Sequence, residues 1–205
     1  MTNELSAAEA AQSIGAARLL PVLRTRNAGD ARDLGLHLLG LGITALELTT
    51  TIPGWEHLLP ELQSAAPQAL IGIGTVGSDE QAERGISAGA HFLVSPYPVA
   101  AARAVAASTD TLFIEGGFTP LELASSSARG LAKLFPAHVG GPSYLKSALA
   151  VLPEARIIPT GGIPISDVPM WLEAGAFAVG VGSDLYTGDI ETKTLGLLRT
   201  LQAIG

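Results

Sequence analysis

The 205-residue chain has no cysteine, and this absence excludes disulfide bonds, thiolate metal ligands and a cysteine nucleophile. The chain also lacks any apolar stretch near the roughly 20 residues that a membrane-spanning helix needs. Its start has neither the basic segment nor the apolar segment of a secretory signal. These absences predict a cytoplasmic protein. Because 47% of the residues are hydrophobic, the composition is typical of a folded chain and excludes a disordered one.

Basic residues are scarce: 12 Lys and Arg stand against 19 Asp and Glu, which gives a net charge of −7. Nucleic-acid binding needs clustered basic residues, so this balance argues against a nucleic-acid partner. The lysines are Lys133, Lys146 and Lys193. Lys146 and Lys193 fall on expected helices, where lysine is ordinary, whereas Lys133 falls within an expected strand.

Eight short apolar runs, bounded by Gly, Pro or Thr, begin about 20 to 26 residues apart and predict buried strands. They cover residues 19–23, 45–48, 70–73, 91–94, 111–114, 131–135, 156–159 and 177–181. Amphipathic stretches with helical spacing fill most of the gaps between them. Examples are residues 30–41, 55–65, 79–88, 99–107, 144–152 and 167–173. Strands that are apolar throughout, rather than alternating, are typical of a parallel sheet covered by helices.

A local pattern occurs at residues 87–94 and 173–180, and more loosely at 41–48. Each copy is interpreted as the end of a helix, a Gly and then a strand, because Gly adopts the left-handed conformation that ends many helices. The pattern therefore predicts that several helices turn directly into a buried strand.

Eight strand–helix units in about 200 residues predict a (β/α)8 barrel close to the minimal size of that fold. A doubly wound open sheet also alternates strands and helices, but its Gly-x-Gly-x-x-Gly motif is missing after the first strand, where Leu23-Arg24-Thr25-Arg26 stands. We expect one domain over residues 1–205. Residues 1–17 are predicted to form a helix that caps the bottom of the barrel.

Two charged residues lie inside apolar strands, Lys133 in the sixth and Glu47 in the second. Active sites of (β/α)8 barrels lie at the C-terminal ends of the strands, and burying a charge without a partner costs several kcal/mol. A lysine that loses its hydration there is favoured in the neutral form, which attacks carbonyl carbons. Glu47 could exchange protons with it. The alternative is an ion pair that serves packing alone.

Other strand ends indicate where a substrate would bind. Thr75 ends the third strand, either as a substrate ligand or as a capping residue only. Gly161-Gly162 and Gly182-Ser183 follow the seventh and eighth strands, where barrels often bind phosphate through backbone N–H groups. Arg24 ends the first strand, beside the eighth in a closed barrel, and would reach the same anion. The four histidines show no metal-ligand spacing, so we expect no metal site.

Six motifs in order extend over about residues 19–190. They are Pro21-Val22-Leu23-Arg24, Leu46-Glu47, Gly72-Ile73-Gly74-Thr75-Val76, Lys133-Leu134-Phe135-Pro136-Ala137, Pro159-Thr160-Gly161-Gly162-Ile163 and Gly182-Ser183-Asp184-Leu185-Tyr186. In this order and spacing the sequence resembles the 2-keto-3-deoxy-6-phosphogluconate and 2-keto-3-deoxy-6-phosphogalactonate aldolases, which are class I enzymes with a (β/α)8 fold.

The resemblance implies cleavage of a 2-keto-3-deoxy-6-phospho sugar acid into pyruvate and glyceraldehyde 3-phosphate. Lys133 would form a Schiff base with C2, Glu47 would move protons, and Thr75 would hold the carboxylate. The phosphate and the rest of the substrate would lie against Arg24, Thr160, Gly161, Gly162, Gly182 and Ser183. The iminium itself is the electron sink, so no metal or organic cofactor is implied. The resemblance also implies a homotrimer.

The sequence departs from the family at two places. Thr49-Thr50-Thr51 stands where gluconate-type enzymes carry an arginine that binds the carboxylate, whereas Thr160 is similar to the gluconate type. Glu115 stands where the family shows Pro-Gly, and we expect its carboxylate close to the imine. There it would favour the protonated lysine, act as a second acid or exclude the usual anionic substrate.

Two other functions stay open from the sequence. A phosphate-binding barrel isomerase or epimerase would use Glu47 as its base, with Lys133 as an electrostatic aid. A non-catalytic sugar-phosphate binding protein would keep the pocket without the chemistry, and Glu115 favours this alternative.

Overall fold

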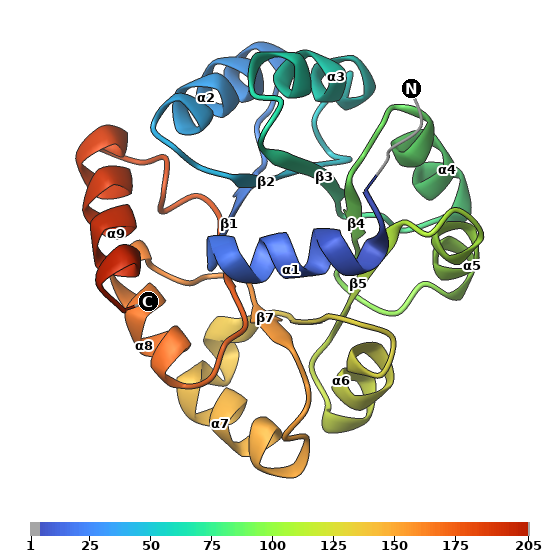
Figure 1. Cartoon of the computed structure of the whole chain (residues 1–205), viewed down its shortest axis with the longest axis vertical. Helices are drawn as coiled ribbons and strands as arrows, with labels where there is room; N and C mark the ends of the chain where they lie inside the picture. Colours follow the sequence, from blue (N-terminus) through green and yellow to red (C-terminus); the bar gives the residue numbers. More distant parts are fainter. Residues whose placement is uncertain (1–4, 205) are drawn as a thin grey trace.

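A computed structural model describes residues 5–204 and shows eight parallel strands enclosed by helices (Figure 1). The strands are β1 (Leu19–Leu23), β2 (Ala45–Thr49), β3 (Leu70–Gly74), β4 (Phe92–Val94), β5 (Leu112–Gly117), β6 (Ala132–Leu134), β7 (Ile157–Pro159) and β8 (Val179–Val181). Their order is β7-β6-β5-β4-β3-β2-β1-β8, and a parallel bridge between Thr160 and Gly180 joins the two ends. The chain thus forms the expected (β/α)8 barrel and not an open doubly wound sheet.

The helices that follow the strands surround the barrel (Figure 1). They are α2 (Ala28–Gly40), α3 (Trp55–Ala65), α4 (Asp79–Ser87), α5 (Ala100–Ser108), α6 (Pro120–Ser127), α7 (Gly141–Val151), α8 (Val168–Glu173) and α9 (Ile190–Ile204). Short 3-10 turns, η1 (Ala137–Val139) and η2 (Ile165–Asp167), precede α7 and α8. The helices expected from periodicity are all present, α9 is the helix expected around Lys193, and α6 occupies a gap in which no helix was specified.

Local signals explain where several helices begin and end. The Ser78 hydroxyl accepts a hydrogen bond from the Gln81 N–H and caps α4, as Ser at this position often does. Gly42, Gly89 and Gly175 each have a positive φ just after a helix, which confirms the repeated helix–Gly–strand pattern. The expected start at Asp167 is shifted, because residues 165–167 form η2 and α8 begins at Val168.

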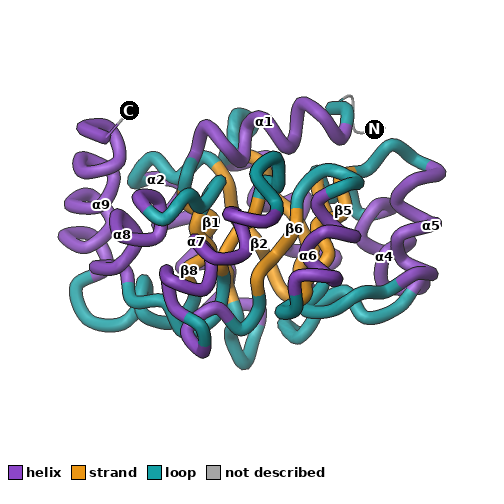
Figure 2. Tube along the Cα trace, turned by 90° about the horizontal axis from the view of Figure 1, so that it is seen from below, coloured by secondary structure: helices purple, strands orange, loops and turns teal. Residues whose placement is uncertain are grey.

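Helix α1 (Ala7–Ala17) lies across the end of the barrel where the strands begin, opposite the loops that follow the strands (Figure 2). Ala10, Ala11 and Ile14 on this helix are buried against the barrel interior. They form one core cluster with interior residues of the strands and their flanks, namely Leu20, Ala45, Leu70, Phe92, Val94, Leu112, Ile114, Leu131, Ile158 and Ala178. The expected capping helix is therefore present within the described chain, and residues 1–4 lie outside it.

The pairing register decides which residues face the barrel interior. Glu115 pairs with Ala132, and Gly116 pairs with Lys133, so the first pair and the second pair face opposite sides of the sheet. Ala132 belongs to the outer core between the sheet and the helices, whereas Ile158, the partner of Lys133 on β7, belongs to the inner core. Lys133 therefore faces the interior and Glu115 faces the helices.

Among the helices of residues 5–204, none has both the length and the apolar character that crossing a membrane requires.

Candidate active site

A cavity of about 460 Å³ opens at the end of the barrel where the strands terminate. Its walls include eight residues singled out from the sequence: Arg24, Glu47, Lys133, Thr160, Gly161, Gly162, Gly182 and Ser183. These residues come from β1, β2, β6, β7, β8 and the loops that follow, so only the closed barrel brings them together. A site at this end of the strands is the usual position of catalytic residues in (β/α)8 enzymes.

Lys133 and Glu47 face each other at the base of this cavity. The Lys133 Nζ lies 3.7 Å from the Glu47 Oε1, and the side chains are only 8% and 1% exposed. The lysine Nζ also lies 5.5 Å from the centre of the Phe135 ring. A carboxylate, an amine and an aromatic wall thus enclose a largely water-free space in which an amine can react with a carbonyl group.

The Glu47 carboxylate is buried without a hydrogen-bond partner for either oxygen among the described residues. Burial raises the pKa of Glu47 above its ordinary value of 4.5, and the charges of Lys133 and Arg24 oppose this rise. A carboxyl group with a raised pKa exchanges protons more readily near neutral pH. Gly74 leaves room for the Glu47 carboxylate, because a Cβ at residue 74 would overlap it.

Arg24 and Thr75 form a second polar group beside the two catalytic candidates. The Arg24 guanidinium donates a hydrogen bond of 3.0 Å to the Thr75 Oγ1. Thr75 has a left-handed backbone with φ +62°, and its carbonyl accepts a hydrogen bond of 2.9 Å from the Thr50 hydroxyl. A threonine held in this sparsely populated conformation is often part of a functional site. The structure thus brings Thr75 to Arg24, although Thr75 does not line the cavity itself.

The loops after β7 and β8 form an anion cradle, which we define as Gly161, Gly162, Gly182 and Ser183. Within the described chain, the backbone N–H groups of Gly162 and Ser183 have no acceptor. Gly161 and Gly162 have φ values of +97° and +68°, and a Cβ on Gly162 would approach the His138 ring. Free N–H groups on tightly turned glycine backbone are typical of sites for phosphate or carboxylate.

Three polar or aromatic residues of the cavity had no role assigned from the sequence: Phe135, Asp184 and Tyr186. The Tyr186 hydroxyl donates a hydrogen bond of 2.6 Å to the Val22 carbonyl, which fixes the loop after β8 to β1. Burial raises the pKa of Tyr186, so its phenol stays protonated as a donor. The Asp184 carboxylate accepts a hydrogen bond from the Ile165 N–H at 2.8 Å. These residues stand within the motifs that carry the family resemblance, but no local sequence pattern could have indicated these contacts.

Glu115 lies on the face of the sheet opposite Lys133, and the expectation that its carboxylate lies close to the imine is wrong. Its carboxylate binds Arg103 of α5 at 2.7 Å, Arg129 at 2.6 Å and the Val99 N–H at 2.9 Å. Burial would raise the pKa of Glu115, but the hydrogen bonds from Arg103, Val99 and Arg129 together hold it below the ordinary value. The error follows from β5, which continues through Gly117 and turns the Glu115 side chain outward.

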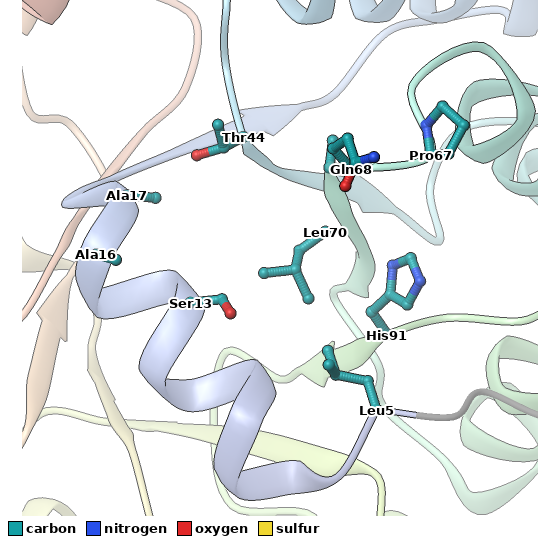
Figure 3. Close-up of a pocket in the computed structure, with 10 residues that line it drawn as sticks. Leu5, Ser13, Ala16, Ala17, Thr44, Pro67, Gln68, Leu70 and His91 are labelled. Atoms are coloured by element: carbon teal, nitrogen blue, oxygen red, sulfur yellow. The ribbon is translucent and has the colours of Figure 1, made fainter.

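A groove of about 720 Å³ lies at the opposite end of the barrel, beside α1 and the starts of β3 and β4 (Figure 3). Ser13, Thr44, Leu70 and His91 contribute to its walls, and among residues 5–204 no Lys, Arg, Asp or Glu lines it. The His91 Nδ1 accepts a hydrogen bond from the Ile71 N–H, so this ring connects the starts of β3 and β4. The groove shares no residue with the cavity that holds Lys133.

Comparison with known proteins finds a family match over most of the chain. Residues 11–198 match the family model for KDPG and KHG aldolase. A probable 2-dehydro-3-deoxy-6-phosphogalactonate aldolase of Rhizobium meliloti is 30% identical over 195 residues, which are 91% of this chain and 92% of that protein.

Two solved structures of aldolases are also similar to this chain. The 2-keto-3-deoxy-6-phosphogluconate aldolase of Zymomonas mobilis with 3-phosphoglycerate superposes with a TM-score of 0.82 at 26% identity, covering 96% of each chain. The KDPG aldolase of Legionella pneumophila, with pyruvate captured as a covalent carbinolamine, gives a TM-score of 0.78 at 26% identity. It covers 98% of this chain and 99% of the other.

Proposed function

The chain belongs to the KDPG and KHG aldolase family, and from this premise we propose that it cleaves a 2-keto-3-deoxy-6-phospho sugar acid through a Schiff base on Lys133. The observation that carries this proposal is the buried Lys133–Glu47 pair at the base of a cavity that ends in an anion cradle. The covalent carbinolamine of the Legionella enzyme supports the same chemistry here.

The pair supplies the proton transfers that the reaction needs. The neutral Lys133 amine attacks the C2 carbonyl, and loss of water leaves an iminium with the substrate. A base removes the proton of the C4 hydroxyl, the C3–C4 bond breaks, and its electrons move into the iminium to form an enamine and an aldehyde. Glu47 accepts and returns these protons, because its raised pKa keeps both protonation states accessible. Protonation of the enamine at C3 and hydrolysis then release pyruvate and restore Lys133.

Arg24 and Thr75 are assigned to the carboxylate of the keto acid. The guanidinium of Arg24 already contacts Thr75, and its charge lowers the pKa of Glu47, so both groups lie beside the reacting end of the cavity. Thr49-Thr50-Thr51 provides no cation there. This assignment moves Arg24 from the phosphate, where the sequence suggested it, to the carboxylate, and leaves the phosphate to the anion cradle.

Borohydride trapping tests the Schiff base directly. Incubation with pyruvate and sodium borohydride should add the reduced pyruvyl group to Lys133, detected by mass spectrometry of the digested protein. Lys133→Met should abolish both the adduct and the release of pyruvate, while Lys146→Met on α7 should retain both. Turnover without a Lys133 adduct and without pyruvate would instead indicate an isomerase or epimerase. Ligand binding without any product would indicate a binding protein.

The configuration of the substrate at C4 is tested with both epimers. The name of the Rhizobium relative supports the galactonate epimer, whereas Thr160 is similar to the gluconate type. Thr160 is nearly buried, and a Cβ on Gly180 would overlap it, so its hydroxyl has a fixed position in the wall. A coupled assay of pyruvate formation from each 6-phosphate epimer, and from the forms without phosphate, gives the ratio of kcat/KM values that defines specificity.

We further propose that the enzyme is a cytoplasmic homotrimer. Tyr97, Leu121 and Val139 are 55%, 80% and 64% exposed, and they follow the consecutive strands β4, β5 and β6. Exposed large apolar side chains that follow consecutive strands support burial of this side of the barrel by another copy of the chain. Light scattering should give three times the mass of one chain, and Leu121→Asp should reduce the mass to that of a monomer. A monomeric wild type would contradict the trimer.

A further inference from the structure

Asp184 connects the two loops that form the anion cradle. It follows Ser183 in the loop after β8, lines the cavity, and its Oδ2 accepts a hydrogen bond of 2.8 Å from the N–H of Ile165. Ile165 begins η2 in the loop after β7, three residues beyond Gly162. One carboxylate therefore holds the two halves of the cradle at a fixed separation.

This connection places a negative charge where an anion would bind. Of the side chains that line the cavity, Asp184 and Glu47 are acidic, while Arg24 and Lys133 lie toward the base that Glu47 occupies. An uncompensated carboxylate beside the cradle would repel a bound phosphate, because like charges at short range oppose each other.

Lys193 supplies the compensating charge from outside the cavity. Its Nζ donates a hydrogen bond of 3.0 Å to the Asp184 carbonyl and lies 3.9 Å from the Asp184 Oδ1. Lys193 lies in the first turn of α9, where a cation is disfavoured by the positive end of the helix dipole. Lys193 therefore stands where the helix dipole disfavours a cation, and its contact with Asp184 explains why a lysine occupies this position.

We propose that Asp184 and Lys193 are positioning residues for the anion cradle. Asp184 holds the two loops of the cradle together, and Lys193 compensates the negative charge of the Asp184 carboxylate. The inference rests on the proposed function, in that the cradle receives the phosphate of the substrate. Neither residue takes part in proton transfer, so both act on substrate binding and leave the step at Lys133 unchanged.

A set of three variants separates the two roles. Lys193→Met leaves the Asp184 charge uncompensated and should raise KM for the phosphorylated substrate about fivefold at low ionic strength, with kcat unchanged. Added salt should reduce this defect. Asp184→Asn keeps an oxygen that can accept from the Ile165 N–H but removes the charge, so its KM should equal or fall below that of the wild type. The double variant should then restore the wild-type KM that Lys193→Met raises. A lysine with only a structural role would not give this restoration, because its loss would not depend on the charge of Asp184.

Binding of glycerol 3-phosphate, measured by calorimetry, tests the inference without turnover. The wild type and Lys146→Met should bind it equally, and Lys193→Met about fivefold more weakly. This readout separates the two proposals, because loss of the pyruvate adduct on Lys133 would refute the Schiff base and leave the binding comparison intact. The inference is overturned if wild type does not bind glycerol 3-phosphate, if Lys193→Met binds it as wild type does, or if the double variant shows no recovery.

Discussion

Gly74 is the residue on which the position of the Glu47 carboxylate depends most directly. A Cβ at residue 74 would overlap that carboxylate and would displace it from its place opposite Lys133. Gly74→Ala should therefore lower kcat by about 100-fold, since small displacements of a catalytic group have effects of this size. Steady-state pyruvate release, with circular dichroism to verify folding, checks the outcome.

Gly196→Ala is the matched control for this substitution. Gly196 lies within α9, and no atom lies within 4 Å of the position that its Cβ would take. Alanine there should raise the free energy of unfolding by roughly 0.5–1 kcal/mol and leave kcat unchanged. Full activity of Gly74→Ala would show that Glu47 does not need its observed position.

The sequence-predicted residues that the fold brings into one cavity share one physical property: each departs from the pattern around it. Lys133 and Glu47 are charges in apolar strands, and Gly161-Gly162 interrupts a strand end. Asp184 carries no such mark, because a carboxylate after a strand is common, and the unusual position of Lys193 becomes visible only once the start of α9 is known. Their role depends on a contact between separate loops and α9, which only the folded chain specifies.

At the scale of single elements, Glu115 fastens β5 to the helices that cover it. The carboxylate is 2% exposed and binds Arg103, on α5, and Arg129, just after α6. Glu115→Gln keeps the shape and removes the charge, and it should lower the free energy of unfolding by about 1–2 kcal/mol at neutral pH. This value is below that of a fully buried pair, because the two arginines are 34% and 38% exposed and water screens them. Urea unfolding followed by circular dichroism measures the change.

The same variant tests on which side of the sheet Glu115 acts. Borohydride trapping of pyruvate on Lys133 should be as efficient in Glu115→Gln as in the wild type. A loss of trapping without a loss of stability would restore a role for Glu115 beside the imine.

Element ends were the least predictable part of the fold. The strand after Thr111 was expected to stop at Ile114, but pairing with β6 carries it through Gly117. Strand length is decided by the neighbouring strand, and apolar character alone ends at Ile114. Because side chains alternate between faces, an uncertain strand end leaves the direction of a residue such as Glu115 undetermined. By contrast, the existence and order of the eight strands followed from their spacing and their Gly stops.

For the molecule as a whole, two buried glutamates with opposite pKa shifts link stability to pH in opposite directions. Burial raises the pKa of Glu47, so ionising it destabilises the folded chain as pH rises above 4.5 and through the raised pKa. The pKa of Glu115 is lowered, so its ionised form stabilises the folded chain above pH 4.5, and this contribution is lost as pH falls through the lowered pKa. The barrel thus carries one carboxylate that favours folding and one that opposes it at neutral pH.

Unfolding of two variants across pH distinguishes these contributions. Glu47→Gln removes the ionisation that opposes folding, so at pH 8 it should be more stable than the wild type by about 1 kcal/mol while losing pyruvate release. Its advantage should shrink as pH falls and vanish below about pH 4, where the wild-type carboxyl is largely protonated in both states. Glu115→Gln should be less stable than the wild type at pH 8, and that deficit should also close toward acid pH. Urea titrations at intervals between about pH 3 and pH 8 measure both curves. A Glu47→Gln protein that is less stable than the wild type at pH 8 would show that the buried charge does not destabilise the fold. The expected pair of opposite signs would mean that the catalytic carboxylate is maintained against the stability of the barrel, whereas the carboxylate on the outer face of the same sheet contributes to it.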